Sequence, residues 1–311
     1  MTGERGLALI MALLVVALVA AIAGALMRGE SVWLTETADI RAQAQAQAAI
    51  DGVLRVAAVL VTAQGRRDRI DDRAERWAGR WPPWPVAGGT VRARLIDPQG
   101  RFNLNDLVVA GRVVPAALAV FARLLRLAGL NPGLARAVAA WEIPPGWPGG
   151  RIDAVYGGRR TPYWAARAPL SRVSELSLVP GFSARVVRVL RPYIAALPRP
   201  TPINVDTAPS LVLCALCPGL TPEEARIVRR EALRTPFASA AAFGEVLPRG
   251  VQPAYRAVTR THYFLVRVTA RFAGLVARRQ GLLYRASRTQ VTVIVWQEAS
   301  WGHHRIPPAR A

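Results

Sequence analysis

The sequence predicts an α+β protein built from a long N-terminal helix, an antiparallel sheet packed on it, and a large helical domain inserted into the sheet. Three observations predict this class. An uncharged apolar run occupies residues 7–27, and helix-forming residues continue it to residue 63. Strand-like alternation occurs at residues 90–96 and returns after residue 261. Between these regions, residues 107–253 have helical periodicity interrupted by prolines.

Residues 7–27 are apolar throughout and carry no charge. As a helix they would span roughly 30 Å, which is the thickness of the hydrocarbon core of a bilayer. Helices in soluble cores are rarely this hydrophobic around their whole circumference. A secretory signal peptide is the alternative, because Ala21, Ala23 and Ala25 offer small residues for a cleavage site.

The residues after this run favour a membrane helix over a cleaved signal peptide. Residues 31–63 contain no proline, and the alternating alanine and glutamine of residues 42–48 are strong helix formers. A continuous helix of about 57 residues would be roughly 85 Å long. Spacings of three and four predict one mostly apolar stripe on its second half, formed by Ile40, Ala44, Gln47, Ile50, Leu54, Ala57 and Leu60.

The chain is strongly basic, with a formal net charge of +21 and arginine as its only cationic side chain. A charge of this size occurs in proteins that bind nucleic acid or anionic membranes. The arginines are scattered through the sequence, however, in doublets no longer than Arg66–Arg67. Because binding patches are recognised by clustering, we expect no nucleic-acid partner. The apolar fraction of 52% argues against disorder.

The two cysteines, Cys214 and Cys217, have the Cys-x-x-Cys spacing of redox and zinc sites. Zinc needs two further ligands, and the three histidines, His262, His303 and His304, lie far away in the sequence. We therefore expect two buried apolar thiols. A strained local disulfide stays open as an alternative if the compartment is oxidising.

Strands are predicted on both sides of the helical region. Residues 77–89 contain the segment WPPWP and are expected to form an irregular connector, because three prolines in five residues preclude a helix. In the strand at 90–96, alternate residues face the core. Three further strands, at residues 261–271, 275–286 and 289–296, complete the sheet, and a loose basic tail follows at residues 301–311.

Two segments of the helical region share a helix, Pro-Gly turn, helix pattern, which predicts helix-hairpin-helix-like (SAM-like) units. The first covers residues 173–190 and the second covers residues 211–226. Thr221 is predicted to cap the helix that follows the second Pro-Gly turn, with Pro222 in its first turn.

No catalytic constellation is present: the sequence lacks a phosphate-binding glycine loop, a His-Glu-x-x-His helix and a Gly-x-Ser-x-Gly elbow. We therefore expect a protein without enzymatic activity. A membrane-anchored DNA-binding protein is the alternative, because helix-hairpin-helix modules hold a phosphate between two glycines. Both turns have the first glycine, Gly181 and Gly219, but Ser183 and Thr221 replace the second. Side chains there obstruct the backbone approach, so packing units are favoured.

Several segments in a fixed order carry a family resemblance. Residues 1–6 are a short polar leader that ends in Gly6, and the apolar run begins at Leu7. Residues 100–105 read GRFNLN directly before the helical region, and residues 203–208 read INVDTA within it. Over most of residues 7–300, the chain resembles the K-type minor pseudopilins of type II secretion systems (general secretion pathway protein K).

The resemblance implies a domain organisation. The leader is residues 1–6, and the transmembrane segment is residues 7–27. A pilin-like body comprises residues 28–106 and 254–300, with the helical domain of residues 107–253 inserted and the tail of residues 301–311 at the end. It further implies a single-pass protein of the inner membrane, with a cytoplasmic N-terminus and a periplasmic bulk.

The resemblance also implies site residues and partners. Prepilin peptidase would cut between Gly6 and Leu7, and the new amino terminus would be N-methylated. Met11 occupies the fifth mature position, where most pseudopilins carry a glutamate that neutralises the terminal amine of a neighbour. A subunit without it suits the filament tip, in contact with the I-type and J-type minor pseudopilins.

Family members often bind calcium through an acidic stretch after a DWID-like segment. In this chain only Glu142 and Asp153 remain there as carboxylates. Because calcium typically takes six to eight oxygen ligands, we expect no metal and no other cofactor.

Overall fold

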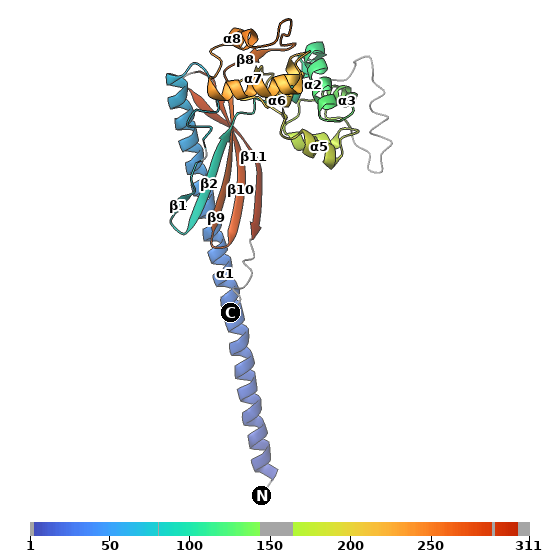
Figure 1. The fold of residues 1–311 in the computed structure, drawn as a ribbon. Helices are drawn as coiled ribbons and strands as arrows, with labels where there is room; N and C mark the ends of the chain where they lie inside the picture. Colours follow the sequence, from blue (N-terminus) through green and yellow to red (C-terminus); the bar gives the residue numbers. More distant parts are fainter. Residues whose placement is uncertain (1–2, 80, 144–163, 288–289, 304–311) are drawn as a thin grey trace.

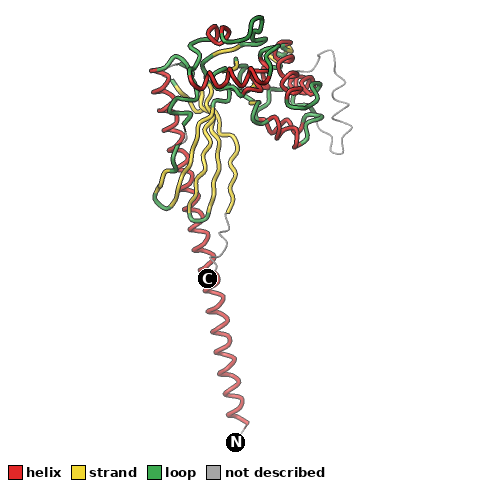
Figure 2. Tube along the Cα trace, viewed as in Figure 1, coloured by secondary structure: helices red, strands yellow, loops and turns green. Residues whose placement is uncertain are grey.

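The computed structural model describes residues 3–79, 81–143, 164–287 and 290–303. A single helix, α1 (Gly3–Arg67), runs through the whole length of the molecule, and a sheet packs along its C-terminal half (Figure 1). The helical domain lies at the upper end of the sheet and extends to one side (Figure 2). The N-terminal half of α1 projects beyond the lower end of the sheet (Figure 2). The predicted α+β class, with its apolar N-terminal helix and antiparallel sheet, is confirmed.

The buried face of α1 differs in part from the predicted stripe. Ile50, Leu54 and Ala57 are buried as expected, but Ile40 is 67% exposed and Ala44 is also exposed. Among the described side chains of α1, the buried apolar row is Ala42, Ala46, Ile50, Val53, Leu54, Ala57 and Val61. Periodicity alone is compatible with either of two neighbouring rows of side chains on α1. The sheet packs on the row with more alanines, whose small side chains let the backbones of α1 and the sheet approach closely.

The main sheet has five strands in the order β1-β2-β9-β10-β11, all paired antiparallel. Its strands are β1 (Trp84–Val86), β2 (Gly89–Ile96), β9 (Tyr263–Phe272), β10 (Leu275–Arg285) and β11 (Val291–His303).

The alternation predicted for β2 and β9 is confirmed, because every second side chain of each strand faces α1. This face holds Val91, Ala93 and Leu95 on β2 and Phe264, Val266, Val268 and Ala270 on β9. A two-residue turn, Ala273-Gly274, joins β9 to β10 with positive φ at both positions, as a tight hairpin requires.

The structure differs from the sequence prediction at the two edges of this sheet. Part of the expected connector forms the short edge strand β1, in which Pro85 pairs with Thr90. Proline is tolerated there because an edge strand need not donate on its outer side. At the other edge, β11 continues to His303, opposite Leu275, so the first three residues of the expected tail belong to the sheet.

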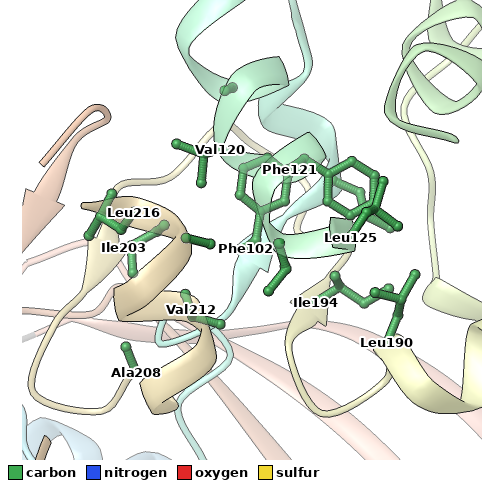
Figure 3. Close-up of a cluster of buried hydrophobic side chains, with 14 of the residues drawn as sticks. Phe102, Val120, Phe121, Leu125, Leu190, Ile194, Ile203, Ala208, Val212 and Leu216 are labelled. Carbon is green, nitrogen blue, oxygen red and sulfur yellow. The ribbon is translucent and has the colours of Figure 1, made fainter. Parts of the chain in front are cut away.

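The helical domain has its own hydrophobic core. Its helices are α2 (Pro115–Leu127), α3 (Leu134–Glu142), α5 (Ala184–Leu190), α6 (Ser210–Leu216), α7 (Pro222–Arg234) and α8 (Ala240–Glu245), with 3-10 turns at Leu104–Asp106 and Val173–Leu178. The hairpin β4 (Val108–Val109) and β5 (Arg112–Val113) lies before α2. At the centre, the rings of Phe102 and Phe121 stack with centroids 5.2 Å apart, and Leu216 and Ile194 lie around them (Figure 3).

This core reaches beyond the boundaries expected from the sequence. Phe102 and Leu104 precede residue 107 but are fully buried in it, and Ala257 follows residue 253 but packs against it. Two short parallel pairings explain the extension. Strand β3 (Phe102–Asn103) pairs with β6 (Ile194–Ala195), and β7 (Ile203–Asn204) pairs with β8 (Ala257–Val258).

Both Pro-Gly turns form as predicted, with φ of 87° at Gly181 and 90° at Gly219. A capping box between Thr221 and Glu224 begins α7. The first unit departs from the prediction, because a 3-10 helix precedes its turn instead of an α-helix. Cys214 and Cys217 are free and buried, as expected.

Candidate functional site: the N-terminal helix, the buried acids and the domain junction

The N-terminal part of α1 presents apolar side chains that the rest of the described chain does not cover. Gly6 and Leu7 lie in its first turns. Met11 is 62% exposed, and large apolar side chains from Leu13 to Ile22 are similarly exposed. An apolar helix left in this state requires a nonaqueous or protein partner, because exposing so much apolar surface to water is unfavourable.

Among the described residues, the stretch Glu36–Arg67 of α1 is long and apolar enough to cross a membrane, whereas Leu13–Gly24 is a shorter apolar stretch. One third of the most apolar 18-residue window of Glu36–Arg67 is buried, however, and that part packs against the sheet. A stretch that covers the core of the body cannot also lie in lipid, so the membrane-anchoring candidate is the uncovered run that includes Leu13–Gly24.

The two calcium candidates are not brought together by the described part of the chain. Glu142 ends α3 and is 3% exposed, while Asp153 lies outside the described residues. Both carboxylate oxygens of Glu142 lack a hydrogen-bond partner among the described residues. Within the same residues, no group of three or more histidine, cysteine, aspartate or glutamate side chains is placed to hold a metal ion. Among the described residues alone, the oxygens near Glu142 are fewer than the six to eight that calcium typically takes.

Burial controls the charge of Glu142 and of two other acids in the helical domain. Burial raises the pKa of Glu142 to about 9, and the negative charge of nearby Asp106 adds to the shift. Burial likewise raises the pKa of Asp106 and of Asp206 to about 7. Hydrogen bonds partly oppose the shifts at the two aspartates, since Asp106 accepts from the amide of Thr201 at 2.8 Å and Asp206 accepts from the amide of Phe237 at 2.8 Å.

A buried ion pair lies where the body meets the helical domain. Arg285, at the end of β10, and Asp71, just after α1, are each about 2% exposed at their side chains and are paired through Nη2 and Oδ2. Arg285 also donates to the carbonyl of Thr261 at 2.7 Å, and Asp71 accepts from the Thr261 amide at 2.9 Å. The guanidinium lies over the ring of Phe264, 5.0 Å from its centroid.

Asn204 connects this pair to the turn after β2. Its side-chain amide donates to the carbonyl of Asp71 at 2.8 Å and to the carboxylate of Asp97 at 2.9 Å. Asp97 also accepts from the hydroxyl of Thr207 at 2.5 Å. A Cβ at Gly100 would lie 2.4 Å from that hydroxyl oxygen, so only glycine allows the turn to approach the 203–208 segment this closely.

The two asparagines of the GRFNLN segment connect it to irregular segments of the helical domain. Asn103 donates to the carbonyl of Arg199 at 2.9 Å and accepts from the amide of Leu197 at 3.0 Å. Asn105 exchanges hydrogen bonds with the backbone of Leu170, at 2.9 and 2.8 Å. Both side chains are almost fully buried, so they satisfy backbone groups that would otherwise be costly to bury.

Comparison with known proteins decides the family. The family model described as type II secretion system (T2SS), protein K matches residues 100–199. The type II secretion system protein K of Pseudomonas aeruginosa is 34% identical over 229 residues, covering 69% of this chain and 68% of the relative. The chain belongs to the type II secretion system protein K family.

Two further similarities agree with membership of the protein K family. The type II secretion system protein K of Klebsiella pneumoniae is 32% identical over 260 residues, covering 77% of this chain and 78% of the relative. The solved GspK-GspI-GspJ complex from the enterotoxigenic Escherichia coli type 2 secretion system contains a chain of the same fold. That chain superposes with a TM-score of 0.72 at 21% identity, over 86% of this chain and 100% of the other.

The sequence indicates where the helical domain of this chain joins the body, but it does not indicate the buried contacts at that junction. The GRFNLN and INVDTA segments carry the family resemblance, and their buried asparagine hydrogen bonds give a physical reason for these residue types. Arg285 and Asp71 carried no local signal, because they are 214 residues apart and neither lies in a motif.

Replacing Arg285 by methionine should destabilise the full-length chain by about 3–5 kcal/mol, because the carboxylate of Asp71 would stay buried without its cation. Urea unfolding in a nonionic detergent measures the change. The matched control is Arg226→Met, which breaks the exposed pair with Glu223 and should leave the free energy of unfolding nearly unchanged. Equal effects of the two changes would contradict a structural role for the buried pair.

The pKa of Glu142 predicts that stability falls as pH rises. A raised folded-state pKa means that the folded chain keeps this proton after the unfolded chain has lost it. Its contribution is therefore complete below the ordinary pKa of 4.5 and is lost as pH rises to about 9. Glu142→Gln should reduce the loss of unfolding free energy between about pH 5.5 and pH 8.5 by up to about 4 kcal/mol, since each pH unit in this range contributes about 1.36 kcal/mol.

The exposed substitution Glu245→Gln serves as the control and should keep the wild-type slope. The slope that remains in Glu142→Gln is assigned to the other acids whose pKa burial raises, namely Glu75, Asp97, Asp106 and Asp206. Added calcium at about 5 mM should leave all three curves unchanged, and a selective rise of wild-type stability at high pH would reveal a metal at Glu142.

Proposed function

We propose that the chain is a non-enzymatic minor pseudopilin that forms the tip of the type II secretion pseudopilus, where it supports pseudopilus assembly and protein export. The observation that carries this proposal is the free apolar half of α1, with Met11 exposed at the position where most pseudopilins have a carboxylate. Family membership supplies the secretion system to which the helix belongs.

The physical argument concerns charge inside an apolar helix bundle. A terminal amine brought into such a bundle is very unfavourable unless a carboxylate from a neighbour neutralises it. The uncharged thioether of Met11 cannot provide this neutralisation to a subunit above it. The subunit is therefore suited to a position with nothing above it, and its exposed side chains from Leu13 to Ile22 would pack on subunits below.

The shape of the folded part supports the same position. The helical domain lies beyond the end of the sheet and extends sideways from the line of α1 (Figures 1 and 2). Within a shaft of parallel helices, such a head would collide with the subunit above. At the tip it meets no such obstacle.

The proposal includes processing, membrane position and partners. Prepilin peptidase would cut between Gly6 and Leu7, and the new terminus would be methylated. The helix would cross the inner membrane once, with a cytoplasmic N-terminus and a periplasmic bulk. The solved complex of related fold contains GspI and GspJ, which supports I-type and J-type minor pseudopilins as the partners of this chain.

DNA binding, the alternative considered from the sequence, gains no support from the comparisons or from the Pro-Gly turns. A Cβ at Gly181 would meet the side chain of Leu134 at 2.5 Å, and one at Gly219 would meet Val251 at 3.5 Å. Both turns therefore lie against the domain's own core, which supports their role as packing units.

Gly6→Glu should block processing when the full-length precursor is coexpressed with its prepilin peptidase. A long charged side chain at the cleavage site replaces the glycine that the peptidase is expected to require. Intact mass spectrometry should show wild-type chain shortened by its six-residue leader and the variant uncut. Normal trimming of Gly6→Glu would contradict the assigned site, and the matched change Gly3→Glu controls for added charge elsewhere in the leader.

Met11→Glu should change the number or length of pseudopili by about twofold or more, because it restores a carboxylate that can pair with the amine of a further subunit. Electron microscopy of cells with overexpressed major pseudopilin measures this change. Met11→Gln has the same size without charge and should behave like the wild type. Pseudopili that are identical for all three chains would argue against tip placement by Met11.

A further inference from the structure

A basic groove lies beside β2 on the pilin-like body, far from the free half of α1. Its cavity of about 630 Å³ is lined by Arg73, Trp77, Trp81, Arg92, Arg94 and Arg101, among others. Cavities of roughly 300–1,000 Å³ are typical of ligand-binding sites. The groove separates the connector that follows α1 from the outer edge of β2, and neither the proposed processing site nor the tip residue Met11 contributes to it.

The edge of β2 that faces this groove is open. Strand β1 pairs with β2 only at Gly89, Thr90 and Val91, and Figure 1 shows it beside the lower part of β2 alone. Val86 and Gly89 flank the two-residue turn and therefore form the first hydrogen-bonded pair of the hairpin. Because hydrogen-bonded positions alternate along a strand, the backbone N–H and C=O groups of the odd-numbered residues of β2 point to this side.

Beyond Val91, the backbone N–H and C=O groups that point to the groove belong to Ala93 and Leu95, and both residues line the cavity. Among the described residues, no backbone of another element bonds to them on that side. An edge strand with free amides and carbonyls is a template for an added strand.

The charge of the groove is not balanced from within the described chain. Arg92 and Arg94 have no acidic partner there, and Arg94 lies directly across from Arg267 on β9, which is an unfavourable pairing of like charges. Arg73 and Arg101 donate to backbone carbonyls, those of Thr207 and Arg191.

The one carboxylate lining the groove, Asp97, is already occupied by Thr207, Asn204 and the amide of Gln99. The pKa of Arg101 is lowered to about 10, first by burial and then by the neighbouring arginines Arg267, Arg94 and Arg73, with Asp97 partly opposing the shift. An anionic ligand would relieve this repulsion.

The opposite wall of the groove is aromatic. Trp77 is buried against Phe264, edge to face, with ring centroids 5.2 Å apart. Trp81 is partly exposed and packs on Trp84 at 5.3 Å. The partly exposed indole of Trp81, beside the buried Trp77, offers apolar contact on the face of the added strand that turns towards the core, while Arg92 and Arg94 lie on the other face.

We propose that this groove binds an extended segment of a partner protein in which acidic and apolar residues alternate. The segment would pair with the backbone of Ala93 and Leu95 as an additional strand. Its carboxylates would lie at Arg92 and Arg94, and its apolar side chains would face Trp77 and Trp81, because strand side chains alternate between the two faces. This inference concerns the body alone and does not depend on the tip position.

The test uses the full-length chain in a nonionic detergent and a labelled, end-blocked hexapeptide of alternating glutamate and valine. Fluorescence anisotropy should show saturable binding that weakens with salt. Arg92→Glu with Arg94→Glu should weaken it at least tenfold, because two attractive contacts become repulsive. Arg271→Glu with Arg278→Glu removes the same charge from the same face outside the groove, and should weaken binding by less than about threefold.

Hydrogen exchange reports the backbone pairing without any substitution. The peptide should slow exchange of the Ala93 and Leu95 amides at least about tenfold and leave the Ala270 amide of β9 unchanged. Ala93→Pro removes one of the two edge donors and should weaken binding by about tenfold, with the thermal unfolding transition checked in parallel.

Three results would overturn the proposal. The first is equal loss of binding in the two double variants, which would indicate only a general effect of charge. The second is equal affinity for a hexapeptide of the same composition with its glutamates and valines in two blocks. The third is duplex DNA binding with the same dependence on Arg92 and Arg94, which would assign the groove to a polyanion.

Discussion

The ion pair between Asp71 and Arg285 is the constraint on which the arrangement of the two domains depends. Arg285 ends β10, Asp71 follows α1, and Asn204 of the helical domain donates to the backbone of Asp71. The pair therefore fixes the end of the long helix to the sheet and to the inserted domain at one point. Burying two charges is unfavourable unless further hydrogen bonds compensate, and here Thr261 and the ring of Phe264 do so. A junction built in this way favours one orientation of the head relative to the helix.

That orientation connects the structure to the proposed role. The inserted domain keeps a core of its own around Phe102 and Phe121, so it can be large without disturbing the sheet. Its position beyond the sheet leaves the face of α1 opposite the sheet uncovered from Ile40 to Val59 and the N-terminal half free. The molecule thus keeps the apolar N-terminal half of α1, which is available for packing with other helices, apart from the folded head (Figure 1). Buried acids such as Glu142 are most favourable in their neutral form, because burial raises their pKa.

The distribution of arginine shows how a uniform composition acquires local meaning. Along the sequence the arginines are scattered, and no segment stands out as a binding patch. Folding brings Arg73, Arg92, Arg94 and Arg101 to one groove beside an open strand edge, while Arg285 is withdrawn into the core. The same side chain therefore serves as a buried structural cation in one place and as an uncompensated surface charge in another. Only burial and the nearest carboxylates distinguish these roles.

By itself, the sequence determined the elements whose signals are local: the continuous α1, the alternating strands β2 and β9, the Pro-Gly turns at Gly181 and Gly219, and the cap at Thr221. Each follows from periodicity or from backbone conformations that few residues adopt, and both act over a few neighbouring residues. The tertiary structure decided which row of α1 is buried, how far β11 extends, and where the core of the inserted domain begins. It also decided that Asp71 meets Arg285, because a contact across 214 residues is set by the packing of whole elements and leaves no trace in local spacing.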